Sequence, residues 1–117
     1  MDTKDLRDVV AFSEDAPAHH DVFESDRVWS ELLCLERAQS HGPVSDPASD
    51  AILTVVAGKV VLQVDRRRKR IGQWSCALVP AGSLVTVTNA SVDPAVVLIV
   101  AAPPPTPTRD EHDLAGG

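Results

Sequence analysis

The chain has 117 residues, of which 44% are apolar and only 3% aromatic, so it is long enough for one domain with an aliphatic core. Its net charge of -6 disfavours nucleic acid as a partner, because affinity for nucleic acid comes from neutralising phosphates. No apolar run approaches the roughly 18 residues that span a bilayer, and the charged start MDTKDLRDVV lacks a signal-peptide core. These features predict a soluble, cytoplasmic protein with no membrane partner.

The first 27 residues are predicted to form a separate, acidic N-terminal segment. Leu6, Val9 and Val10 fall on one face of a short helix over residues 3–12, and Thr3 is placed to cap it. Residues 13–27 are polar and rich in turn formers, which indicates an irregular segment. The adjacent His19-His20 is interpreted as an exposed loop pair, whose side chains point opposite ways in an extended chain.

From residue 28 to residue 102 the composition favours strands. Short apolar, β-branched runs are separated by turn signals: VWSELLCL, AILTVVAG, KVVLQV, DRRRKRIG, WSCALVPAG, SLVTVTN and AVVLIVA. The stretch QSHGPVSDPASD, residues 39–50, is predicted to be a loop. Several short strands at this spacing predict an all-β sandwich or barrel over 28–102. Residues 103–117 form a Pro-rich tail, predicted to be extended or disordered because proline cannot donate to a sheet ladder.

Two further features have plain structural interpretations. Cys34 and Cys76 lack a metal-binding spacing, so both are predicted to be buried thiols rather than a disulfide or a zinc site. The run RRRKR, residues 66–70, is predicted to be a solvated hairpin tip; the alternative is a contact with the acidic N-terminal segment of the same or a second subunit. No aromatic residues interleave the five bases, so stacking on nucleic-acid bases is not expected.

A glycine, strand and Pro-x-Gly pattern stands in the second half of the chain. Gly72 is followed by the strand CALV, then by Pro80-Ala81-Gly82, by Val85 after two further residues and by Asn89 after three more. This order resembles the second motif of the cupins, except that cupins carry a metal-binding histidine where this chain has Val85. The stretch from Trp29 to 105 is therefore identified as similar to a small single-domain cupin of type 2, a jelly roll or double-stranded β-helix barrel.

The first cupin motif, counted back from Gly58, resembles this chain in its loop and following hairpin but not in its ligands. The position of the family's glutamate is Ala51, and those of its two histidines are Val44 and Asp46. Val and Ala have no lone pairs for a metal ion, so the resemblance implies a cupin with no metal and no cofactor. Strand alternation turns these positions inward and predicts a dry, aliphatic cavity floor.

The first function hypothesis is that the cavity binds or shapes a small hydrophobic metabolite, as in a biosynthetic pathway. The predicted ligand-binding residues are Trp29, Glu36, Val44, Ala51, Leu53, Val55, Val85 and Val87.

The second hypothesis is a metal-independent isomerase or cyclase, which the resemblance to metal-independent cupins also suggests. Asp46 and His41 are its predicted acid–base residues, because a carboxylate beside an aliphatic floor has a raised pKa. Alternatively, Asp46 and Asp50 simply make turns, or join His41 in a displaced metal site. The third hypothesis is a non-catalytic structural partner of another cupin. A homodimer is expected, because small cupins commonly pair through sheet edges, and Trp74 is a candidate for that interface or for a flat ligand.

Overall fold

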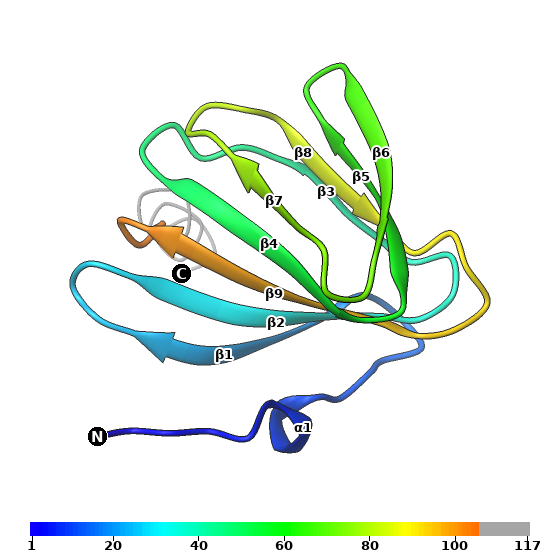
Figure 1. The fold of residues 1–117 in the computed structure, drawn as a ribbon, viewed down its shortest axis with the longest axis horizontal. Helices are drawn as coiled ribbons and strands as arrows, with labels where there is room; N and C mark the ends of the chain where they lie inside the picture. The colour runs from blue at the N-terminus through cyan, green and yellow to red at the C-terminus, as the bar shows by residue number, and fades with distance from the viewer. Residues whose placement is uncertain (106–117) are drawn as a thin grey trace.

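The structure is a computed structural model that describes residues 1–105, and it confirms the predicted all-β class. The strands are β1 Ala18–Glu24, β2 Trp29–Leu35, β3 Ser40–Val44, β4 Asp50–Ala57, β5 Lys59–Val64, β6 Arg67–Gly72, β7 Cys76–Val79, β8 Val85–Thr88 and β9 Ala95–Ala102. They form two antiparallel sheets that face each other as a jelly-roll barrel (Figure 1). Within residues 1–105, no helix is both long and apolar enough to span a membrane.

The five-stranded sheet has the order β1-β2-β9-β4-β7, and the four-stranded sheet has the order β3-β8-β5-β6. Side chains alternate between the two faces of each strand, so every second residue points into the barrel. The inward residues make one aliphatic core: Leu33, Leu35, Leu53, Val55, Val60, Leu62, Val79, Val87, Ala95 and Val97. This core fills the end of the barrel where β2 ends and β9 begins.

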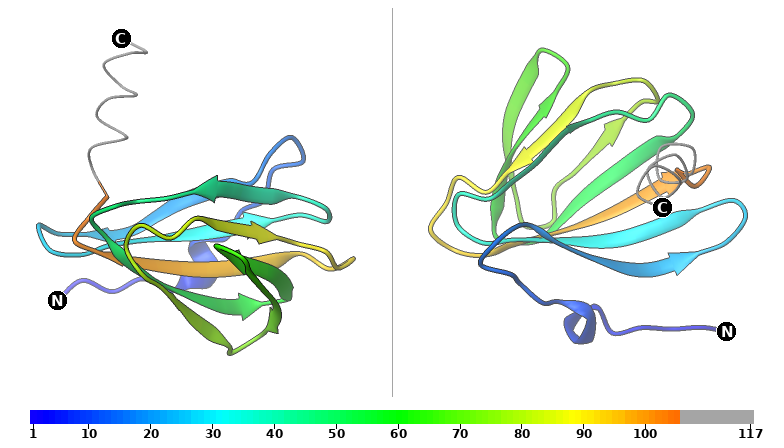
Figure 2. Two further views of the ribbon diagram at one scale, coloured as in Figure 1. Left: turned by 90° about the horizontal axis from the view of Figure 1, so that it is seen from above. Right: turned by 180° about the vertical axis from the view of Figure 1, so that it is seen from behind.

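The N-terminal segment covers the part of the five-stranded sheet's outer face that β2 and the start of β9 form. Its helix, α1 (Leu6–Val9), lies beside β1 (Figure 1 and the right view of Figure 2). Leu6 and Val9 pack against a second cluster built on Leu32, Cys34 and Val96. The predicted helix is present but shorter, and its cap is not Thr3: the Asp5 carboxylate accepts the Arg7 N–H at 3.0 Å.

Two strands lie where the composition predicts loops. β1 falls inside the polar stretch 13–27, and β3 falls inside the predicted loop 39–50. Each is the edge strand of its sheet, and edge strands carry polar residues that weaken the apolar alternation. Because β1 pairs with β2, the sheet extends to residue 18, on the N-terminal side of the predicted boundary at 28. Of the predicted tail, residues 106–117 lie outside the described part of the chain.

The prediction for the cysteines is right for one of them. Cys34 is buried in β2, and burial raises the pKa of its thiol. Cys76 is exposed, so the prediction of two buried thiols is wrong there. Cys76 pairs with Thr54 on the outer face of the edge strand β7, which nothing in residues 1–105 covers.

The asparagine of the cupin-like motif has a structural role. Asn89 is completely buried, and its amide nitrogen donates to the carbonyl oxygens of Leu35 at 3.0 Å and Asp93 at 2.8 Å. Its amide oxygen accepts the backbone N–H and the hydroxyl of Ser91. One side chain therefore holds the end of β2 against the loop that leads into β9.

We expect Asn89→Ala to lower the free energy of unfolding by about 2–4 kcal/mol, because it removes the donor to the buried Leu35 carbonyl and three further hydrogen bonds. Urea unfolding followed by circular dichroism measures this change. Thr88→Val, one residue earlier, is the control: it removes an exposed hydroxyl bond to Ser40 and should cost no more than about 0.5 kcal/mol. Equal effects of the two variants would contradict the role assigned to Asn89.

Candidate functional site

A cavity of about 470 Å³ lies at the end of the barrel where β2 begins and β9 ends, the left-hand end in Figure 1. Its floor is aliphatic and comprises Val44, Ala51, Leu53, Val85, Val87, Ile99 and Ala101. Trp29, Pro80 and Pro105 also line it. The polar groups are His19, Glu31, His41, Ser45, Asp46, Ser49 and Ser83.

Most of the predicted site residues line this cavity. They are Trp29, Val44, Ala51, Leu53, Val85 and Val87, together with His41 and Asp46. Their roles in binding or catalysis stay predictions. Glu36 and Val55 are not part of the lining. Glu36 follows the far end of β2, where its N–H donates to Gln39, and Val55 is fully buried in the packed core.

The polar wall of the cavity is built from a histidine and a glutamate on neighbouring strands. His19 pairs with Leu33 across β1 and β2, so both side chains point into the barrel. The Nδ1 atom of His19 lies 2.8 Å from a carboxylate oxygen of Glu31, whose residue is only 8% exposed. The sequence predicted an exposed loop for His19, and this is wrong, because His19 lies in strand β1. His20 does point the other way, as expected, with Nε2 2.9 Å from the Ala11 carbonyl oxygen.

His41 completes this wall from the opposite sheet. It lies on β3 and pairs with the buried Val87 of β8, which turns its ring inward. The ring centroids of His41 and His19 are 4.7 Å apart, with an interplanar angle of 70°. This edge-on contact joins β1 and β3, the edge strands of the two sheets.

The two histidines have opposite electrostatic environments. The hydrogen bond to Glu31 raises the pKa of His19, and the Glu31 charge adds to this, while partial burial opposes it. Burial lowers the pKa of His41, and the neighbouring His19 cation lowers it further against the attraction of Glu31. The His19 ring therefore keeps its proton to a higher pH than the His41 ring does.

Asp46 and Asp50, between β3 and the start of β4, use their carboxylates to accept hydrogen bonds from backbone N–H groups. The Asp46 carboxylate accepts the Ala48 N–H at 2.8 Å, while the Asp46 carbonyl accepts the Gly82 N–H at 2.8 Å. The Asp50 carboxylate accepts the Ala81 N–H at 2.8 Å and does not line the cavity. The cavity rim is thus tied to the Pro-x-Gly loop, as expected of aspartates in turns.

Solved structures resemble this chain, although no protein-family model and no curated protein matches it. TT1209 from Thermus thermophilus is 30% identical, with a TM-score of 0.85 over 88% of this chain and 98% of that chain. A conserved protein with a double-stranded beta-helix domain from Klebsiella pneumoniae is 17% identical, with a TM-score of 0.82 over 86% and 89% of the two chains. An RmlC-like cupin from Desulfovibrio desulfuricans is 19% identical, with a TM-score of 0.80 over 89% and 98%.

The chain is a small single domain with the cupin fold. Its four positions corresponding to metal ligands, Val44, Asp46, Ala51 and Val85, all line the cavity, and only Asp46 has a donor atom in its side chain. Within residues 1–105, no three His, Cys, Asp or Glu side chains are grouped to hold a metal ion, so His41, Asp46 and Asp50 do not assemble a displaced site. The donor set does not fit the metal that the fold family implies.

In this cupin we expect the His19–Glu31 pair to add stability that depends on pH. Because the folded-state pKa of His19 is raised, the contribution is full below the unfolded value of about 6.5 and is lost as pH rises through the folded value. His19→Gln should therefore lower the free energy of unfolding more at about pH 6 than at about pH 9. The difference should stay below about 1 kcal/mol, since the His19 side chain is 38% exposed.

Urea unfolding at the two pH values measures this difference. His20→Gln is the matched control, because it removes the neighbouring histidine on the outer side of β1. The assignment would be wrong if both variants showed the same pH dependence.

Proposed function

We propose that this cupin binds a small, largely apolar organic molecule inside the barrel cavity. The observation that carries the proposal is the division of the lining: an aliphatic floor, with the His19, Glu31 and His41 groups gathered on one wall. A volume of about 470 Å³ suits a small metabolite, and a few polar groups around an apolar pocket are typical of sites that orient such ligands. The ligand's polar group would lie against the two histidines.

The charge at this wall favours an uncharged ligand. The Glu31 carboxylate lies 2.8 Å from the His19 ring and balances its charge when that ring is protonated, and Asp46 places a second carboxylate in the lining. An anionic ligand would meet two carboxylates against a single cation. A neutral molecule with a hydroxyl or carbonyl group can hydrogen-bond to either histidine without that repulsion.

Filling the floor should weaken binding of a neutral probe such as benzyl alcohol. Ala51 and Ala101 face each other in the β4–β9 ladder, and both line the cavity, so Ala51→Leu adds its extra atoms to the cavity. We expect Ala51→Leu to weaken binding about tenfold or more, since it removes apolar contact area from the site. Chemical shifts of backbone amides on β4, β8 and β9 during titration measure the affinity.

Ala102→Leu is the matched control for this titration. It adds the same atoms to the next residue of β9, which is exposed and outside the cavity lining, and should leave affinity unchanged. Equal affinities in Ala51→Leu and in the unmodified protein would refute binding inside the barrel, and so would shifts confined to the outer surface.

A second candidate function is a metal-independent isomerase or cyclase, and the histidine pair specifically favours it. Environments that push two pKa values apart supply an acid and a base at one pH. Neutral His41 would take a proton from the carbon next to a carbonyl group, while the His19 imidazolium gives its proton to the carbonyl oxygen. With a β,γ-unsaturated carbonyl substrate this gives a dienol; protonated His41 then delivers its proton to the terminal carbon, and the hydroxyl proton returns to His19, which completes the isomerisation and restores both histidines. Glu31 would hold the imidazolium, and Asp46, engaged with Ala48, would have no part in the transfer.

Exchange of the α-hydrogens of cyclohexanone with deuterium oxide tests this chemistry by proton NMR. We expect His41→Gln to slow the protein-dependent exchange about a hundredfold, in the range typical of a lost general base. His20→Gln, outside the barrel, should leave the rate unchanged. A large loss in Asp46→Asn with none in His41→Gln would return the base role to Asp46. Binding of the ketone without exchange would leave the first function alone standing.

A further inference from the structure

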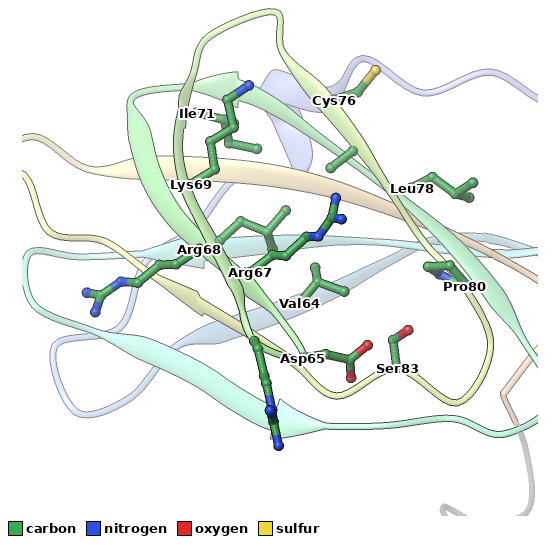
Figure 3. A pocket seen from close by; sticks show the side chains of 13 residues that line it. Val64, Asp65, Arg67, Arg68, Lys69, Ile71, Cys76, Leu78, Pro80 and Ser83 are labelled. Atoms are coloured by element: carbon green, nitrogen blue, oxygen red, sulfur yellow. The ribbon is translucent and has the colours of Figure 1, made fainter.

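A second hollow lies on the other side of the Pro-x-Gly loop from the cavity. It is a groove of about 1070 Å³ between β6, an edge strand of the four-stranded sheet, and β7, an edge strand of the five-stranded sheet (Figure 3). No hydrogen-bonded ladder joins these two strands. Pro80 and Ser83 line both the groove and the cavity, so this loop separates them. The groove lies outside the site described above.

The groove has an apolar floor that comes from the barrel interior. Leu62, Val64, Ile71 and Ala77 belong to the core cluster or pack against it, and all four line the groove. Leu78 adds an apolar side chain at the rim, where it is 63% exposed. In the described part of the chain, the groove between β6 and β7 therefore exposes apolar surface that an aliphatic ligand could contact.

Two cations stand over this floor. In the β5–β6 ladder Arg67 pairs with Val64 and Lys69 pairs with Leu62, so both basic side chains share the inward face with the floor residues. Figure 3 shows Arg67 extending across the groove toward the strand of Leu78, whereas Arg68 points away.

These cations have no partner of opposite charge among residues 1–105. The ion pairs there are Arg7–Asp5 and His19–Glu31, so the acidic N-terminal segment does not neutralise the basic run. The carboxylate in the groove lining, Asp65, accepts the Leu84 N–H at 2.9 Å. The basic run at 66–70 lies on the β5–β6 hairpin, which protrudes from the barrel (Figure 1).

We propose that the groove binds an amphipathic anion, a molecule with an aliphatic chain and a carboxylate head. The chain would cover the floor of Leu62, Val64 and Ile71, and the carboxylate would pair with Arg67 and Lys69. Arginine offers a planar fork to a carboxylate and lysine a point charge, so together they suit a single anionic head. This site is independent of the proposed function, because its floor residues and cations lie outside the first cavity and it prefers an anionic ligand where the cavity favours an uncharged one.

Titration of the full chain with octanoate, followed by backbone amide shifts, tests the proposal. We expect shifts on β5, β6 and β7, and not on β1 or β3, which border the first cavity. Arg67→Gln combined with Lys69→Gln should weaken binding about five- to thirtyfold, since it removes two solvent-facing ion contacts. The neutral probe 1-octanol should bind more weakly than octanoate, and added salt should reduce the difference.

The matched control is Lys59→Gln combined with Arg70→Gln. It removes the same charge from the same hairpin, but these residues pair with Gly72 and Val61 on its outer face and do not line the groove. Octanoate affinity should stay within about twofold of the unmodified protein. Equal losses in both double variants would reduce the effect to general attraction by the basic run and overturn the site.

The same experiment distinguishes other occupants of the groove. An absence of shifts on β5, β6 and β7 would overturn the proposal. Salt-sensitive self-association in sedimentation, abolished by the Arg67 and Lys69 double variant and not displaced by octanoate, would assign the groove to a second copy of the chain. Either result would leave the proposal for the first cavity standing, because the titration with benzyl alcohol tests that proposal separately.

Discussion

The structure depends on how two sheets with apolar inner faces close against each other without a backbone ladder at their edges. On one side β1 and β3 meet through the His19–His41 ring contact, with rings 4.7 Å apart. On the other side β6 and β7 border an open groove. Each seam must place side chains where hydrogen-bonded strands would otherwise stand. The polar wall of the cavity lies at the first seam, and the apolar and basic groove lies at the second.

The motif residues that this cupin keeps are explained by the scaffold and not by metal binding. A Cβ atom on Gly58 would lie 2.5 Å from the Pro94 carbonyl oxygen, and its φ of 76° is rarely adopted by other residues, so the β4–β5 turn requires glycine. Asn89 donates to the carbonyl group of the fully buried Leu35 and to that of Asp93. Both features hold the barrel ends in place, whatever lines the cavity. Val and Ala at the ligand positions therefore leave the fold intact while changing the chemistry of its interior.

Sequence reasoning was strongest where alternation is strongest, and it located β4, β5 and β7 to β9 because their inward residues are aliphatic. The hairpin at Asp65 was also predictable, although Asp65 itself adopts a φ of 54° in place of a glycine. The His19–Glu31 pair was missed because β1 is a polar edge strand with an irregular register, and its contact joins residues on two strands. Glu31 was the signal in the sequence for this pair. It is a charged residue in the apolar strand β2, and it lies on the same inward face as Leu33 and Leu35.

The two hollows differ in the charge of their linings. In the cavity, Glu31 and Asp46 supply two carboxylates beside the His19 and His41 rings, and no lysine or arginine is among the lining residues. In the groove, four basic residues at 66–69 stand beside Asp65 alone. Because Pro80 and Ser83 line both hollows, an occupant of one bears on the loop that shapes the other. The Asp50 carboxylate and the Asp46 carbonyl fix that loop through the N–H groups of Ala81 and Gly82. Coupling between the hollows would therefore have to act against these two hydrogen bonds, through a displacement of the Pro-x-Gly loop.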